Sequence, residues 1–165
     1  MKIRVENDEK INIKTLILAI RTQFLSYIDF VIREWKNMEI LHLEENEIRE
    51  IEPKAFHYFY TLQTLYLADN KLVKIEDGIF LQMRNLSKIH LDHNLLETVP
   101  NDFMLMNQLK TLTLTNNKII SVNWWHFRMV SIDILKLYGN PMNCTCNNYE
   151  LRQWSGYGIT NLYAN

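Results

Sequence analysis

The sequence predicts an α/β solenoid, a horseshoe with a parallel sheet on its concave side and an irregular or short-helical convex side. Three observations predict it. A pattern of eleven residues recurs five times, its starts lie 24, 24, 23 and 23 residues apart, and an asparagine holds one fixed place in it. The five copies are MEILHLEENEI from Met38, LQTLYLADNKL from Leu62, LSKIHLDHNLL from Leu86, LKTLTLTNNKI from Leu109 and IDILKLYGNPM from Ile132.

The paired aliphatic residues of each copy, such as Leu65 and Leu67, predict a short strand. Alternate residues of a strand point to one face, and a return segment before the next strand makes neighbouring strands parallel, about 4.8 Å apart. The asparagine falls where the chain leaves the strand and turns inward. Its amide offers both acceptor and donors for backbone groups that this turn buries. We therefore expect a structural ladder of Asn46, Asn70, Asn94, Asn117 and Asn140.

The second half of each repeat also has a rule. Phe56, Phe80 and Phe103 follow the closing aliphatic residue by seven or eight positions, and an apolar residue comes three later. This spacing predicts an apolar spine under the convex side. The fourth repeat departs from it, because His126 holds the phenylalanine position. We expect one residue of the Trp124–Trp125 pair to fill the core there and the other to be exposed.

The two ends differ from the repeats. Residues 1–37 are expected to form an N-terminal cap and a degenerate first repeat, in which Arg21 replaces the asparagine. Residues 38–142 hold the five repeats. Residues 143–165 are expected to form a truncated, cysteine-containing C-terminal cap. Such caps are needed because a terminal repeat otherwise exposes a core face and a sheet edge.

The period and the internal pattern resemble those of leucine-rich repeats. The likeness is to extracellular leucine-rich repeat proteins and covers roughly residues 13–160. The segment NPMNCTCNNYELRQW is similar to the C-terminal cap of that family, with matching residues Asn140, Pro141, Cys144, Cys146, Leu151 and Trp154. The full cap pairs its two cysteines with two more downstream. The resemblance therefore implies disulfides of Cys144 and Cys146 with partners beyond residue 165 or in a second chain.

Composition limits the function. The 165 residues suit one domain, and a net charge of −1 gives no indication of nucleic acid or an anionic membrane as partner. No apolar stretch reaches the roughly 18–20 residues of a membrane span. The sequons at Asn85 and Asn143, together with the Cys-x-Cys, favour a secreted glycoprotein with disulfides. A metal bound by Cys144 and Cys146 is the disfavoured alternative, because no further ligand lies at metal spacing.

The strand residues facing the concave side form columns that suggest a binding surface. One column holds His42, Tyr66, His90, Thr113 and Lys136, and the next holds Glu44, Ala68, Asp92, Thr115 and Tyr138. A metal site would need two histidines about 10 Å apart to converge, and an open face excludes no water for a hydrolytic dyad. A solvated polar face and a protein-binding face remain.

We expect no catalytic site, metal or other cofactor, and we expect a protein partner over His42, Tyr66, His90 and Asp92. Tyr66 is the expected anchor, since aromatic residues dominate interface hot spots. The convex Trp124–Trp125 pair is the alternative surface.

Within the family, KINIKTLIL leading into KNMEILHLEENEIREIEPKAFHYFYTLQTLYLADN resembles the insect, mosquito-type, leucine-rich-repeat immune proteins. This resemblance implies a secreted, non-enzymatic recognition module of innate immunity. It implies a complement-like or other immune protein as partner, and a disulfide-linked or non-covalent oligomer, although the family's coiled coil is absent here. The alternatives are the ectodomain of a Toll-like or other leucine-rich repeat receptor, and a cytosolic regulatory leucine-rich repeat subunit. The repeat period and the Cys-x-Cys argue against the cytosolic alternative.

Overall fold

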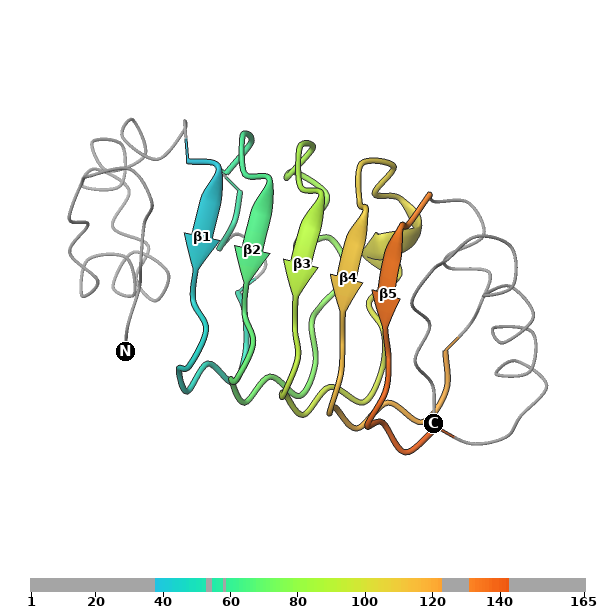
Figure 1. Ribbon diagram of the computed structural model, residues 1–165. Coiled ribbons are helices and arrows are strands. Elements are labelled where there is room, and N and C mark those ends of the chain that lie inside the picture. The colour runs from blue at the N-terminus through green and yellow to red at the C-terminus, as the bar shows by residue number, and fades with distance from the viewer. Residues whose placement is uncertain (1–37, 53–54, 58, 123–130, 143–165) are drawn as a thin grey trace.

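Five parallel strands lie side by side in one sheet, in chain order (Figure 1). The computed structural model describes residues 38–52, 55–57, 59–122 and 131–142. The strands are β1 (Ile40–His42), β2 (Thr64–Tyr66), β3 (Lys88–His90), β4 (Thr111–Thr113) and β5 (Ile134–Lys136). The predicted parallel solenoid is thereby confirmed. The expected caps at 1–37 and 143–165 lie outside the described residues.

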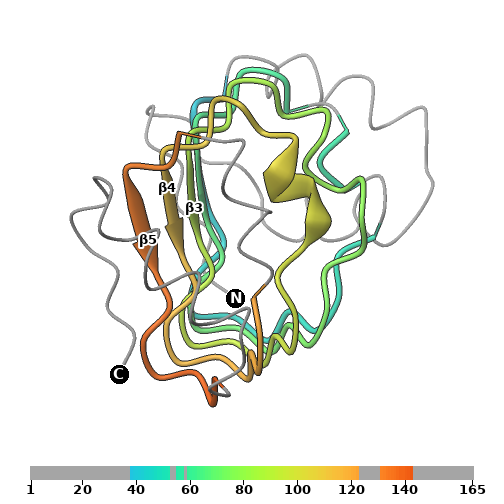
Figure 2. The same cartoon turned by 90° about the vertical axis from the view of Figure 1, so that its right-hand side faces the viewer.

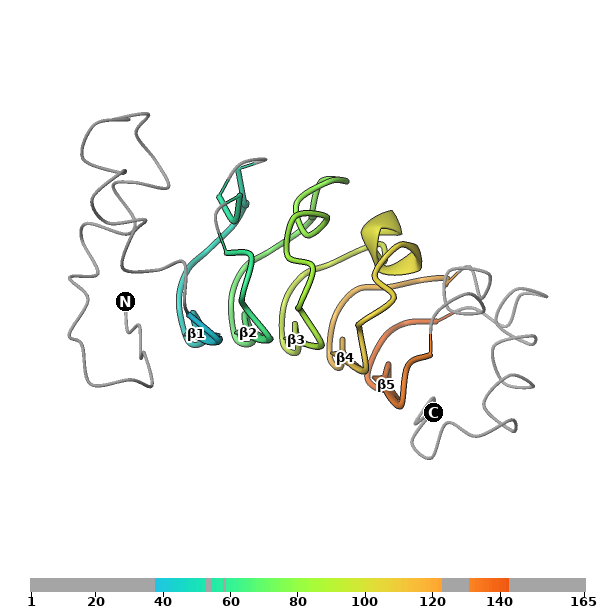
Figure 3. The same cartoon turned by 90° about the horizontal axis from the view of Figure 1, so that it is seen from above.

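Each repeat makes one coil of the solenoid. Figure 2 looks along the stack and shows the strands on one side and the return segments closing each coil on the other. The view from above separates the successive coils (Figure 3). Among the described residues the return segments are irregular apart from one short 3₁₀ helix, η1 (Asn101–Met104). The convex side is therefore irregular and short-helical, as the sequence predicts.

The core follows from the alternation within each strand. Leu65, Leu67, Ile89 and Leu91 are 0% exposed, and Leu41 and Leu43 are 1% exposed. The pairing register matches equivalent positions of every repeat, so that Leu41 pairs with Leu65 and Leu65 with Ile89. A slip by one residue would turn the leucines to solvent, so burial fixes the register. The alternate side chains therefore form columns on the outer face of the sheet, called the concave face below.

A spine of phenylalanines closes the core behind the sheet. Phe80 stacks between Phe56 and Phe103, with ring centroids 6.3 and 5.6 Å apart. All three rings are at most 2% exposed, and Phe59, Met83 and Met106 are buried beside them. The predicted spine is thus confirmed for three repeats. His126, Trp124 and Trp125 of the fourth repeat lie outside the described residues.

The repeated asparagines join each coil to the one before it. The Asn94 amide nitrogen donates to the Leu67 carbonyl of the preceding repeat at 2.9 Å, and its oxygen accepts from the Leu72 amide at 3.0 Å. Asn70, Asn117 and Asn140 make the same two kinds of bond one repeat away. Asn46 donates to the Leu43 and Glu44 carbonyls. One side chain thus satisfies a buried donor and several buried acceptors.

The residue before each asparagine has a left-handed backbone. Its φ is 54° at Glu45 and Asp69, 55° at His93, 53° at Asn116 and 74° at Gly139. Glycine, asparagine and aspartate adopt this conformation most easily. Gly139 is also sterically required, because a Cβ there would meet the Asn116 Oδ1 atom at 2.0 Å. The left-handed turn residue before the asparagine therefore recurs in all five repeats, as the asparagine itself does.

A buried carboxylate links the third coil to the second on the convex side. Asp102, in η1, is 2% exposed. It accepts hydrogen bonds from the Gly78 amide at 2.6 Å and the Phe80 amide at 2.9 Å. The sequence pattern missed this role, because Asp102 occurs in only one repeat. One feature of the sequence could have indicated it: Asp102 is polar, whereas the equivalent residues before the phenylalanine in the first two repeats are Ala55 and Ile79.

We expect Asn94→Ala to destabilise the protein by about 1–3 kcal/mol, because it leaves the Leu72 amide and the Leu67 carbonyl buried without partners. The free energy of unfolding, measured with urea, checks this. The control is Asn116→Gly, which suits the left-handed backbone at φ 53° and should change stability by less than about 0.5 kcal/mol. Equal losses in the two variants would contradict the structural role of the ladder.

We expect Asp102→Ala to cost about 2–3 kcal/mol, because two backbone amides of the preceding repeat lose a charged acceptor. The matched control is Asp133→Ala. This substitution removes the same charge at an exposed position of the fifth repeat. Thermal unfolding of both variants checks the difference. A loss at Asp133 as large as that at Asp102 would show a charge effect in place of the buried contacts.

Candidate functional site

The columns of the concave face place the sequence-predicted residues next to one another. The register pairs His42 with Tyr66, Tyr66 with His90, His90 with Thr113 and Thr113 with Lys136. The strands that carry these residues are only three residues long. Each strand contributes its last residue to the column. The partners on either side are set by the parallel register and the strand spacing of about 4.8 Å.

Three rings of this column form a continuous stack, the ring stack. Tyr66 lies between the two imidazoles, with its centroid 4.5 Å from that of His42 and 4.7 Å from that of His90. Both interplanar angles are 7°, so the three rings are nearly parallel. All three residues are partly buried. Each ring thus holds its neighbour in place, and the sequence could not show this because it gives the column but not the rotamers.

At the β1 end, a carboxylate orients the first imidazole. His42 Nδ1 lies 2.8 Å from Glu44 Oε1, and the two side chains are 16% and 34% exposed. The second carboxylate oxygen, Glu44 Oε2, has no hydrogen-bond partner among the described residues although it is shielded from solvent. Glu44 therefore has one bonded oxygen and one further acceptor beside the ring stack.

At the β3 end, a hydroxyl and a carboxylate orient the other imidazole. His90 Nδ1 lies 3.1 Å from Thr113 Oγ1, and that hydroxyl donates to Asp92 Oδ2. Asp92 Oδ1 also accepts from the Thr115 amide at 2.9 Å and the Thr115 hydroxyl at 2.6 Å. Both oxygens of Asp92 are engaged inside the chain. The sequence places Thr113 and Thr115 in the columns, but it does not show that Thr113 links His90 to Asp92 or that Thr115 holds Asp92.

The environment of His90 favours its neutral form. Burial lowers the pKa of the His90 imidazole below its ordinary value of 6.5. The nearby Asp92 carboxylate opposes this shift in pKa, Lys136 and Lys88 reinforce it, and the more distant Glu44 opposes it. Near neutral pH the ring is therefore uncharged, and its proton sits on one nitrogen only.

His42 and His90 lie in one column but do not converge on a single metal ion, because the Tyr66 ring lies between their imidazoles. Within the part of the chain that the structure describes, no three His, Cys, Asp or Glu side chains are grouped to hold a metal. The exposed sequon residue Asn85 lies before β3. Cys144, Cys146 and Asn143, the other residues singled out from the sequence, lie outside the described residues.

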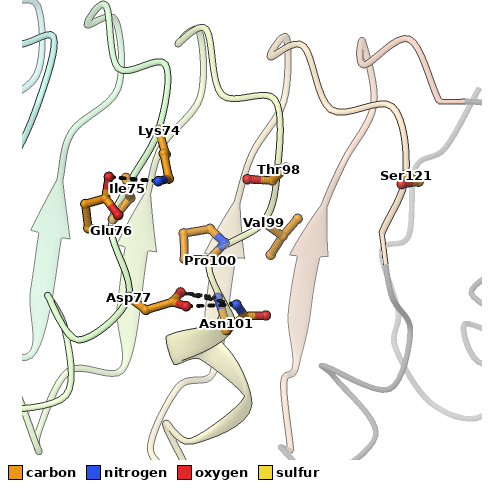
Figure 4. Close-up of a pocket in the computed structure, with 9 residues that line it drawn as sticks. All are labelled: Lys74, Ile75, Glu76, Asp77, Thr98, Val99, Pro100, Asn101 and Ser121. Atoms are coloured by element: carbon orange, nitrogen blue, oxygen red, sulfur yellow. Dashed lines mark hydrogen bonds and ion pairs between the residues drawn. The ribbon is translucent and has the colours of Figure 1, made fainter.

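A shallow cleft lies on the return segments, away from the ring stack. It measures about 480 Å³ and runs between the second and fourth repeats (Figure 4). Its charged groups already have partners inside the cleft, because Lys74 pairs with Glu76 at 2.8 Å and the Asn101 amide donates to Asp77. None of the predicted site residues lines it. The concave face remains the better candidate site.

Over the described ranges, no helix has the length and apolar character to cross a membrane.

Comparisons with known proteins agree with the repeat pattern. The family model described as Leucine rich repeat matches residues 12–72 and 60–119. The chain is 31% identical to human chondroadherin over 93 residues, 56% of this chain and 19% of that protein. It is 34% identical to Tsukushi-A of Xenopus laevis over 113 residues, 67% of this chain and 30% of that protein.

A third relative is the mouse high affinity nerve growth factor receptor, 30% identical over 65 residues, 39% of this chain and 8% of that protein. The matched region therefore spans less than a third of each of these three relatives. Chondroadherin and tsukushi place homologues of this chain among extracellular proteins with the same repeat.

We expect His90 to titrate below pH 6.5, because burial disfavours its charged form. The unfolded chain then binds more protons than the folded one as the pH falls through about 6.5, so stability declines over that range and is fully present above it. NMR titration of the His90 ring and urea unfolding at several pH values check both statements. The His90→Phe variant should lose part of this pH dependence. A His90 midpoint at or above 6.5 would contradict the expectation.

Proposed function

Because the chain belongs to the leucine-rich repeat family, we propose that it is a non-enzymatic protein-binding module whose concave face holds the partner. The family and the relatives that match are binding proteins, and solenoids present extended surfaces of this kind. The observation that carries the proposal is the ring stack of His42, Tyr66 and His90 across β1, β2 and β3.

The ring stack suits binding because its side chains are ordered before a partner arrives. Association costs roughly 0.5–1.5 kcal/mol for each flexible side chain that it immobilises. Here Tyr66 is held by both imidazoles, and the imidazoles are held by Glu44 and Thr113. Tyrosine also combines a large apolar ring with a polar tip, which is why it is frequent in interface hot spots. Tyr66 is therefore the proposed anchor, with His42, His90 and Asp92 around it.

A secreted protein of innate immunity is the finer form of this proposal. It is supported by the resemblance to insect immune proteins, the extracellular relatives and the two sequons, of which Asn85 is exposed. Its proposed partner is a complement-like or other immune protein, with Cys144 and Cys146 available for a disulfide-linked complex. Mass spectrometry of the native protein tests this form. Oxidised cysteines and glycosylated Asn85 or Asn143 support it, whereas free thiols with bare asparagines would contradict it and favour a cytosolic regulatory subunit.

A receptor ectodomain is the second candidate. One of the matching relatives is by name the high affinity nerve growth factor receptor. The full-length coding sequence separates the two candidates. A membrane-spanning segment after the repeats would favour the receptor, and a coiled coil would favour the soluble immune protein.

We expect the double variant Tyr66→Ala, His90→Ala to bind the partner that co-purifies with the native protein at least tenfold more weakly, because it removes two rings of the ring stack. Surface plasmon resonance with the purified complex components measures the change. The matched comparison is Trp124→Ala, Trp125→Ala, which tests the convex alternative and should leave affinity unchanged. Both variants must first show parental circular dichroism. A folded concave variant with parental affinity would refute the proposal.

A further inference from the structure

The hydrogen bonds of β3 and β4 assign the proton of the His90 ring. An ionised carboxylate only accepts hydrogen bonds, so the single proton of the Thr113 hydroxyl is used in its bond to Asp92 Oδ2. In its contact with His90 Nδ1, the Thr113 oxygen must then be the acceptor. His90 therefore carries its proton on Nδ1. In the neutral ring, Nε2, the nitrogen farther from the backbone, has only a lone pair.

At the other end of the ring stack, the Glu44 carboxylate assigns the proton of the neutral His42 ring. Its Nδ1 faces Glu44 Oε1 at 2.8 Å, and that oxygen accepts. The proton of the neutral His42 ring is therefore also on Nδ1, and its Nε2 is an acceptor. In the neutral form of each ring, both histidines thus carry the same kind of atom, an unprotonated Nε2. The two differ from an ordinary exposed histidine, whose tautomer is not fixed by neighbours.

The charged groups closest in sequence to the ring stack are carboxylates, which are hydrogen-bond acceptors like the unprotonated Nε2 atoms. Four carboxylates follow the ends of the first three strands: Glu44, Glu45, Asp69 and Asp92. The lysines of the face lie elsewhere, Lys88 at the opposite end of β3 and Lys136 two strands away on β5. A partner over β1 to β3 therefore meets hydrogen-bond acceptors and negative charge together.

We propose that the ring stack is an acceptor site for a basic segment of a partner protein, with an arginine or lysine placed at each histidine. This inference rests on the proposed function and names the chemistry of its partner. Arg is the best match, since its planar guanidinium carries five donors and no acceptor. The two histidines lie two strand spacings apart, about 10 Å, so two separate basic side chains are needed. In an extended segment that distance corresponds to about three residues.

Protonation of the two imidazoles changes the site from one that accepts hydrogen bonds to one that donates them. A charged imidazole donates from both nitrogens, so each Nε2 changes from acceptor to donor and adds a positive charge facing the partner's cations. The groups facing His90 are Asp92 and Glu44, which favour its charged form, and Lys88 and Lys136, which oppose it. Glu44, two residues after the end of β1, faces His42, and Tyr66 faces it from β2. Binding of a basic segment is therefore strongest at neutral pH and lost on acidification.

The tautomers are tested first on the full chain. Long-range ¹H–¹⁵N correlation spectra at about pH 7.5 distinguish protonated from unprotonated ring nitrogens. We expect Nδ1–H for both His42 and His90. In Thr113→Val, which removes the acceptor hydroxyl, His90 should shift toward the Nε2–H form, whereas Thr111→Val on the same strand should leave it unchanged. An Nε2–H form of either histidine in the parent protein would overturn the inference.

The partner chemistry is tested with a capped Arg-Gly-Gly-Arg peptide and its Glu-Gly-Gly-Glu counterpart. We expect the arginine peptide to shift the ring signals of His42, Tyr66 and His90 at about pH 7.5, with at least tenfold weaker affinity at about pH 5. His90→Phe keeps a stacked ring but removes the acceptor, so it should weaken the peptide at least fivefold. Tyr66→Phe keeps the stack and both acceptors and should stay within about threefold of the parent.

The outcomes separate this inference from the proposed function. Equal or tighter binding of the glutamate peptide, or no binding of the arginine peptide at millimolar concentration, overturns the inference. The proposed function still stands in that case if the native partner is lost from the Tyr66→Ala, His90→Ala variant. If the arginine peptide binds as expected and the native partner is unaffected by that variant, the acceptor site is real but the concave face is not the partner's surface.

Discussion

The hydrogen bonds of the repeated asparagine hold the solenoid together, and the other features of the structure depend on them. Each strand is only three residues long, so ladder bonds alone join two coils weakly. The inward turn after the strand then buries further backbone groups, which must be paired. Asn94 pairs them across two coils at once, by donating to Leu67 and accepting from Leu72. Among uncharged side chains, only the carboxamides of Asn and Gln offer two donors and an acceptor together, and Asn is the shorter of the two.

The candidate site is a consequence of this constraint. Four of the asparagines, Asn70, Asn94, Asn117 and Asn140, bridge their repeat to the one before it. Equivalent residues therefore lie opposite each other from β1 to β5. Aromatic side chains at one such position are then separated by about one strand spacing. The observed centroid distances of 4.5 and 4.7 Å in the ring stack match that spacing. Stacking of His42, Tyr66 and His90 therefore follows from the fold once the three residues occupy one column.

Periodic features could be predicted from the sequence and single contacts could not. The strands, the columns, the phenylalanine spine and the positions of the asparagines all recur, so their phase assigns them to a face. Asp102 occurs once and bonds the backbone of the preceding repeat, so no period marks it. The same holds for Thr113, whose hydroxyl lies between His90 and Asp92. Such contacts depend on rotamers and on neighbours 20 or more residues away in the chain.

Asp92 shows how the structure changes the meaning of a predicted site residue. The sequence places it on the concave face as a direct contact for the partner. Its two oxygens also accept three hydrogen bonds from Thr113 and Thr115. Asp92 takes the Thr113 proton in this way and leaves the Thr113 oxygen to accept from the His90 ring.

This network also weighs against a face that is merely solvated. A polar surface kept only for solubility requires exposed charge, and it does not require fixed tautomers or three rings within 7° of parallel. Ordering these side chains costs conformational entropy in the free protein. A partner that binds the ordered rings no longer bears that cost, which favours recognition as the role of this face.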